Sequence, residues 1–158
     1  ARKLNISKTY RRLMSFTQHK NLEVKVTSSA RLHMGFFDLH GGLGRRFGSI
    51  GLSLSAPHLA LTASHSDQFQ VLGVMPERAM TIATQLMRKL NLDTAIRLDI
   101  HQSIPEHAGL GSGTQLALAI GRAISELHHL DLSTQKIAEL TGRGRRSGIG
   151  IAAFDHGG

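Results

Sequence analysis

Cysteine and tryptophan are absent from this sequence, and a single tyrosine occurs among its 158 residues. The lack of cysteine excludes disulfide bonds and thiolate catalysis, and it fits a reducing compartment, for which we expect the cytoplasm. No apolar run approaches the roughly 20 residues that a membrane-spanning helix needs, so we expect no membrane partner. Because a binder of single-stranded nucleic acid stacks bases on aromatic side chains, the scarcity of tyrosine and tryptophan argues against nucleic acid as a partner.

Acidic residues are also scarce, with 11 Asp and Glu against 19 Lys and Arg, and the net charge of +8 favours anionic partners such as phosphorylated metabolites. Much of the positive charge lies in two places. Residues 1–21 lack strong periodicity and contain no acid, so we expect a basic N-terminal extension outside the folded domain, which spans residues 22–158. The second cluster is Arg143, Arg145 and Arg146, which is either an anion site or a solvated basic turn after a helix.

Hydrophobic periodicity predicts an α+β fold, in which strands precede helices in blocks. Alternating apolar residues predict strands over residues 22–34 (one long or two short), 49–55, 58–64, 68–74 and 95–103. Apolar residues three and four apart predict helices over residues 77–91, 116–130 and 134–140. Residues 35–51 contain six glycines among charged and aromatic residues, which predicts a flexible functional loop.

The segment from Ile104 to Thr114 has the form of a phosphate-binding turn, because its glycines lie between a predicted strand and the N-terminus of a predicted helix. Glycine allows positive φ angles and close approach of a ligand to the backbone. The first turn of a helix has unpaired N–H groups and the positive end of the helix dipole, which attract an anion. The predicted phosphate-binding residues are Gly109, Leu110, Gly111, Ser112, Gly113 and Thr114. A hydroxyl of Ser112 or Thr114 can also cap the helix, and a plain turn is the alternative to a binding loop.

Three stretches of the chain carry a resemblance to the GHMP kinase superfamily. Its second motif, in which a proline and Gly-Leu-Gly-Ser open a helix that holds a nucleotide or diphosphate, resembles residues 104–119, IPEHAGLGSGTQLALA. Its later Ser-Gly-x-Asp segment resembles residues 147–158, SGIGIAAFDHGG. Within the superfamily, the family of β-ribofuranosylaminobenzene 5′-phosphate synthases, which serve methanopterin biosynthesis, is similar also in residues 29–54, SARLHMGFFDLHGGLGRRFGSIGLSL. The resemblance extends over residues 24–158.

The resemblance implies a ribosomal protein S5 domain 2-like fold and a transferase reaction. The implied reaction condenses 4-aminobenzoate with phosphoribosyl diphosphate and releases carbon dioxide and diphosphate, with Mg²⁺ on the diphosphate. A second, C-terminal domain that closes the site is also implied, and this chain shows no counterpart, so we expect a truncated domain with weak binding and little turnover. Where many kinases of the superfamily have the aspartate of Ser-Gly-x-Asp, this chain has Gly150, which cannot orient or deprotonate a hydroxyl. That difference favours the synthase over a kinase.

The implied reaction also suggests roles for charged residues, because the ribose gains positive charge in the transition state and the leaving group gains negative charge. Asp38 is the predicted catalytic carboxylate, which faces the ribose cation or holds Mg²⁺ through water; capping of a turn is the alternative. Arg45 and Arg46 are predicted to assist catalysis, because a planar guanidinium donates pairs of hydrogen bonds to phosphate. Further predicted phosphate ligands are Arg143, Arg145, Arg146 and Ser147.

Arg31 and His33 alternate on a predicted strand and would share one face, where they could meet a substrate carboxylate or phosphate. An ordinary polar sheet face explains them equally well. The ten histidines show no helical metal-ligand spacing, so the metal ligands stay unknown. A GHMP-type kinase that binds ATP and a non-catalytic nucleic-acid-binding module are the alternative functions. The oligomeric state is open, with a homodimer as one alternative.

Overall fold

The computed structural model describes residues 22–42, 44, 48–144 and 148–157. Along the chain, the elements are β1 (Glu23–Phe37), β2 (Gly48–His65), β3 (Gln70–Gly73), α2 (Pro76–Lys89), β4 (Ile96–Gln102), α3 (Ser112–Leu127), α4 (Thr134–Leu140) and α5 (Ile149–His156). The predicted basic extension lies outside the described residues, as do the predicted site residues Arg45, Arg46, Arg145, Arg146 and Ser147. No helix in the described part of the chain is long and apolar enough to cross a membrane.

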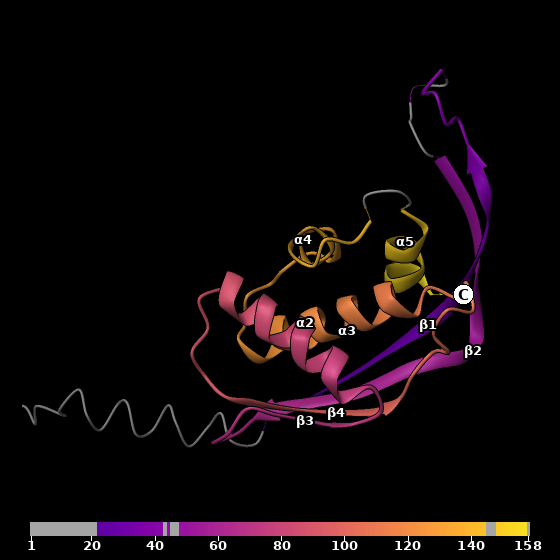
Figure 1. Cartoon of the computed structure of the whole chain (residues 1–158). Helices are drawn as coiled ribbons and strands as arrows, with labels where there is room; N and C mark the ends of the chain where they lie inside the picture. The colour runs from indigo at the N-terminus through magenta and orange to yellow at the C-terminus, as the bar shows by residue number, and fades with distance from the viewer. Residues whose placement is uncertain (1–21, 43, 45–47, 145–147, 158) are drawn as a thin grey trace, which may run out of the picture.

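The fold has two layers, with a four-stranded sheet on one side and the helices together on the other (Figure 1). The strands lie in the order β1-β2-β4-β3, in which β2 is antiparallel to both β1 and β4, and β3 is parallel to β4. A parallel pair needs a crossover connection, and α2 supplies it between β3 and β4. This arrangement confirms the predicted α+β class.

The core lies between the sheet and α3, because both present apolar side chains to their interface. On β4 the alternate residues Ile96, Leu98 and Ile100 are at most 1% exposed, as expected of a strand with one buried face. α3 is buried along most of its length, and its Leu116 and Ile120 pack into the same cluster. Burial of each such side chain contributes about 2 kcal/mol. The core therefore fixes the direction of α3 and the position of its N-terminus.

The hairpin of β1 and β2 is longer and more continuous than the sequence predicts. β1 is one long strand, and the predicted strands 49–55 and 58–64 are joined in β2. Pro57 does not end β2, because it lies at a register shift of the β1–β2 ladder, where its missing N–H costs no ladder hydrogen bond. The prediction of a flexible loop over residues 35–51 is wrong at both ends, since these residues belong to the two paired strands.

The C-terminal segment contains a helix, α5, that the sequence did not predict because glycine and arginine surround a short apolar patch there. α5 packs against β1, β2, α3 and α4. On α5, Asp155 accepts a hydrogen bond from the hydroxyl of Thr134 on α4, and Nη2 of Arg122 on α3 donates to the same hydroxyl at 3.0 Å. These polar contacts tie α5 to the other two helices.

Two helix ends bring arginine side chains close to each other. α4 begins and ends where the sequence predicts, and it ends in a Schellman turn, in which the N–H of Arg143 donates to the carbonyl of Ala138 at 2.7 Å. α2 begins with Pro76, whose fixed φ suits the first helical position, and Arg78 follows in its first turn. Arg78 and Arg143 thus meet from two helices that are separated in sequence.

Candidate anion-binding site

The glycine-rich loop lies between β4 and α3, as the sequence predicts. Gly111 is the N-cap of α3 with a φ of 79°, a conformation that favours glycine, and no side chain caps the helix. Ser112 and Thr114 lie in the first turn, so the expected hydroxyl cap is not formed. The N–H groups of Thr114 and Gln115 donate to the carbonyl of Gly111. Among the described residues, no hydrogen bond uses the N–H groups of Ser112 and Gly113, which lie at the positive end of the helix dipole.

Arg31 on β1 holds this loop in place. Its backbone N–H donates to the carbonyl of Leu110 at 3.0 Å, and its Nη1 donates to the carbonyl of Gly109 at 3.3 Å. Its Nε lies 2.9 Å from the position that a Cβ would take on Gly111, so this glycine also gives room to the guanidinium. Nε is buried without a hydrogen-bond partner, and burial lowers the pKa of Arg31. The structure thus brings Arg31 to the predicted phosphate loop.

Two further guanidinium groups converge on the first turn of α3. Nη2 of Arg78 lies 2.5 Å, and Nη1 of Arg143 lies 3.5 Å, from the position that a Cβ would take on Gly113. Burial lowers the pKa of Arg143, and the positive charge of Arg78 lowers it further. Arg78 also forms an ion pair with Glu106, which precedes the glycines in the loop. Like charges gathered at a helix N-terminus create a place where an anion is electrostatically favoured.

Arg78 is the site residue that sequence reasoning missed. It lies in the first turn of an amphipathic helix, where an arginine has no distinguishing spacing or motif. Only the packing of α2 beside α3 brings it to the loop. The sequence placed Arg78 in the first turn of the predicted helix 77–91, but it did not indicate that this turn lies beside the glycine loop.

α5 borders the site at Gly150. The carbonyl of Gly150 accepts a hydrogen bond from Nε2 of Gln115 at 2.8 Å, and the side chain of Gln115 is fully buried. A Cβ on Gly150 would lie 2.9 Å from Cγ2 of Thr114. A side chain therefore does not fit at the position where the family resemblance places the aspartate of kinases unless Thr114 moves.

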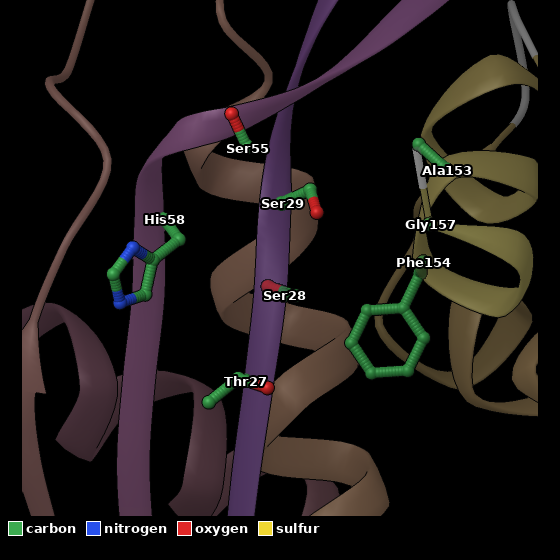
Figure 2. A pocket seen from close by; sticks show the side chains of 8 residues that line it. All are labelled: Thr27, Ser28, Ser29, Ser55, His58, Ala153, Phe154 and Gly157. Atoms are coloured by element: carbon green, nitrogen blue, oxygen red, sulfur yellow. The ribbon is translucent and has the colours of Figure 1, made fainter.

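A pocket of about 410 Å³ lies where β1 and β2 meet the end of α5 (Figure 2). It is lined mainly by side chains that can form hydrogen bonds, together with one phenyl ring: Thr27, Ser28, Ser29, Ser55, His58, Ala153, Phe154 and Gly157. Figure 2 shows the ring of Phe154 on one side of β1 and His58 on the other. The Oγ of Ser28 is buried and has no hydrogen-bond partner. Ser29 in the pocket and Arg31 at the glycine loop are two residues apart on β1, about 7 Å along the strand.

The other described candidates lie farther along the hairpin, which continues beyond the helices (Figure 1). His33 packs its ring 4.4 Å from that of Phe36, and its Nε2 is buried without a hydrogen-bond partner. Asp38 directly follows β1, and its buried Oδ1 lies 3.9 Å from Nδ1 of His40. The strand from Arg31 to Asp38 is roughly 20 Å long. Because strand pairing continues to the end of β1, the structure does not bring Asp38 to the glycine loop.

Comparison with known proteins agrees with this geometry. Residues 77–158 match the family model described as GHMP kinases N terminal domain. A beta-ribofuranosylphenol 5'-phosphate synthase of Archaeoglobus fulgidus is 41% identical over 137 residues, which cover 85% of this chain and 43% of that protein. The protein of the same name from Methanocaldococcus jannaschii is 35% identical over 147 residues, which cover 84% of this chain and 44% of that protein. The chain thus spans less than half the length of these relatives.

The fold also has a counterpart among solved structures. The crystal structure of L. major mevalonate kinase in complex with R-mevalonate superposes with a TM-score of 0.60 at 17% identity, over 85% of this chain and 47% of that chain. At this identity the likeness shows the fold alone. Together with the family match, it confirms the predicted superfamily fold.

We expect Gly111→Ala to weaken the binding of inorganic pyrophosphate about tenfold, because the added methyl group displaces Arg31 from the loop and strains a positive φ. Gly109→Ala is the matched control, since its φ is 72° and nothing lies within 4 Å of the added Cβ. It therefore imposes backbone strain without displacing Arg31. Titration calorimetry of both variants measures the difference.

A double-mutant cycle with Arg31→Ala isolates the contribution of the guanidinium. In that background the effect of Gly111→Ala should shrink to that of Gly109→Ala, because the displaced group is gone. Equal losses of pyrophosphate affinity in Gly109→Ala and Gly111→Ala, with Arg31 present, would contradict the assignment of Arg31 as the residue that holds the loop.

Proposed function

Since this chain belongs to the GHMP kinase N-terminal domain family, we propose that it is the diphosphate-binding part of a synthase that joins ribose 5-phosphate to an aromatic ring. The proposed substrates are phosphoribosyl diphosphate and a benzoate. Support comes from the two relatives at 41% and 35% identity, both named as synthases of a ribofuranosylphenol 5'-phosphate. The cluster of guanidinium groups at the N-terminus of α3 suits the diphosphate of such a substrate.

The glycine at position 150 is the main observation that favours this synthase over an ATP-dependent kinase of the same superfamily. A kinase needs a group that orients or deprotonates the attacking hydroxyl, and the resemblance places an aspartate at this position. Here the backbone of α5 packs so closely on Thr114 that even a Cβ would be crowded. The glycine loop still lies at the N-terminus of α3, so we expect it to bind phosphate without the carboxylate of a kinase.

The proposed reaction forms one bond and breaks two. The ring carbon that carries the carboxylate attacks C1 of the ribose, and the C1–O bond to the diphosphate breaks with its electron pair leaving on the diphosphate. The carboxylate then departs as carbon dioxide, and its bonding pair restores the aromatic ring. During the first step, positive charge develops on the ribose and negative charge on the leaving group.

The glycine loop would bind the leaving diphosphate. In this proposal the N–H groups of Ser112 and Gly113 and the guanidinium of Arg143 donate to its oxygens, and such charge-assisted bonds strengthen as negative charge grows. Arg31 fixes the loop, so these donors do not have to reorganise during the reaction. The residues that stay predictions for catalysis or phosphate binding are Asp38, Arg45, Arg46, Arg145, Arg146 and Ser147.

We assign the aromatic substrate to the pocket of Figure 2, whose lining residue Ser29 is two residues from Arg31 on β1. The ring of Phe154 offers a flat apolar contact. The hydroxyls of Thr27 and Ser29, which also line the pocket, offer hydrogen bonds to a polar substituent. The printed names of the relatives specify a phenol, whereas the family resemblance implies an aminobenzene. Both 4-hydroxybenzoate and 4-aminobenzoate are therefore candidate substrates.

Mg²⁺ fits this site as an ion carried by the diphosphate. Within the described ranges, no group of three or more His, Asp and Glu side chains could hold a metal ion by itself. In phosphate sites Mg²⁺ keeps several waters and is bound largely through substrate phosphates, so the ion would enter with the ligand. When bound, the ion would neutralise part of the charge that grows on the leaving group.

Replacing Gly150 by alanine should lower the free energy of unfolding by about 1–2 kcal/mol, because the new methyl group crowds Cγ2 of Thr114. Thr114→Ser removes that Cγ2. In the Thr114→Ser background the same change should be neutral or stabilising, since alanine favours a helix over glycine by about 1 kcal/mol. Urea unfolding of the four proteins measures both effects. An equal destabilisation in both backgrounds would show that Thr114 does not exclude a side chain from this position.

Ligand-dependent stability of this chain tests the function without requiring turnover. Phosphoribosyl diphosphate at 100 times its Kd should stabilise the fold by about 2.7 kcal/mol. ATP at the same concentration should give a clearly smaller effect, because the site is proposed to bind the diphosphate of an activated ribose. Thermal unfolding in the presence of Mg²⁺ and each ligand measures the two shifts. Protection by ATP but not by phosphoribosyl diphosphate would favour a kinase and overturn the synthase.

A further inference from the structure

The ion pair between Arg78 and Glu106 joins the first turn of α2 to the segment that precedes the glycines. The side chains are 37% and 38% exposed, so water screens the attraction and the pair adds little to stability. The two terminal nitrogens of Arg78 point to different groups. Nη1 pairs with Glu106, while Nη2 lies 2.5 Å from the Cβ position of Gly113. Arg78 therefore stands between an acid of the chain and the anion site.

Arg143 lies near the same point, with its Nη1 3.5 Å from the Cβ position of Gly113. Its pKa is lowered by burial and by the positive charge of Arg78, as expected where two guanidinium groups lie close together. Within the described part of the chain, no ion pair joins Arg143 to an acid, and its Nε is buried without a hydrogen-bond partner. Glu106 therefore compensates Arg78 and leaves Arg143 uncompensated. A multiply charged anion between the two arginines would compensate both.

We propose that Arg78 and Glu106 form an exchangeable pair, in which Arg78 leaves Glu106 and binds the diphosphate when the ligand enters. The inference rests on the proposed function only in that the ligand carries a diphosphate. A diphosphate competes well against a carboxylate for Arg78, because it carries more negative charge. Its oxygens can also accept hydrogen bonds from both terminal nitrogens of one guanidinium. The exposure of the pair lets it open without uncovering the core.

The exchange gives the two partners opposite effects on ligand affinity. Removing the charge of Arg78 deletes a phosphate ligand and should weaken binding. Removing the charge of Glu106 deletes the competitor for Arg78 and should strengthen binding. A purely structural ion pair gives a different pattern, because losing either partner then disturbs the loop in the same way.

Titration calorimetry with inorganic pyrophosphate tests this on the chain itself. We expect Arg78→Gln to raise the Kd about tenfold and Glu106→Gln to lower it about threefold. Arg88→Gln is the matched control for Arg78→Gln, since Arg88 is an exposed residue in the last turn of the same helix. Glu126→Gln is the control for Glu106→Gln, because Glu126 also pairs with an arginine, Arg122 at 3.6 Å, and its own side chain is 56% exposed. Both controls should change the Kd less than twofold.

Weaker binding in both Arg78→Gln and Glu106→Gln would overturn the exchange, as would an Arg78→Gln variant that behaves like Arg88→Gln. Thermal unfolding of each free variant detects loss of the fold, and Glu106→Gln keeps the proposal falsifiable if Arg78→Gln is unstable. Repeating the titrations with phosphoribosyl diphosphate and ATP separates the two proposals. If the two variants change the Kd in opposite directions but the chain binds ATP more tightly than phosphoribosyl diphosphate, the exchange is kept and the synthase is rejected. Tight binding of phosphoribosyl diphosphate without dependence on Arg78 would reject only the exchange.

Discussion

The burial of α3 against the sheet is the constraint on which the candidate site depends. Leu116 and Ile120 anchor the helix in the core, so its N-terminus has a fixed position and direction. Arg31 then connects the glycine loop to β1 through one backbone and one side-chain hydrogen bond. N–H donors that are held in advance do not have to reorganise when negative charge develops near them. The core thereby fixes the positions of these N–H donors.

Uncompensated positive charge is the second property of this place. Burial lowers the pKa of both Arg31 and Arg143, which means that the protein surroundings disfavour their charged forms relative to water. Two guanidinium groups flank Gly113, and Glu106 pairs with only one of them. Binding of a diphosphate would relieve this cost. A side chain at Gly113 would displace Arg78, because its Cβ would lie 2.5 Å from Nη2 of that arginine.

The sequence predicted the parts of this fold that depend on local pattern. The strand at residues 95–103, the loop after it and the helix at residues 134–140 all agree with the structure, because periodicity and capping act over a few residues. Long-range pairing was not predictable in this way. The predicted break between two strands at Pro57 does not occur, because β2 pairs with β1 on both sides of a register shift that contains Pro57. Arg78 reaches the site, and Asp38 lies well away from it, through tertiary packing and hairpin pairing that no short motif records.

The central claim is that the N-terminus of α3 binds the diphosphate of a phosphorylated sugar. Backbone amide NMR of this chain, titrated with phosphoribosyl diphosphate and Mg²⁺, tests it most directly. The account predicts that the largest and saturable chemical-shift changes occur at the N–H groups of Ser112 and Gly113. Changes confined to other parts of the chain, with those two amides unaffected at saturation, would contradict it.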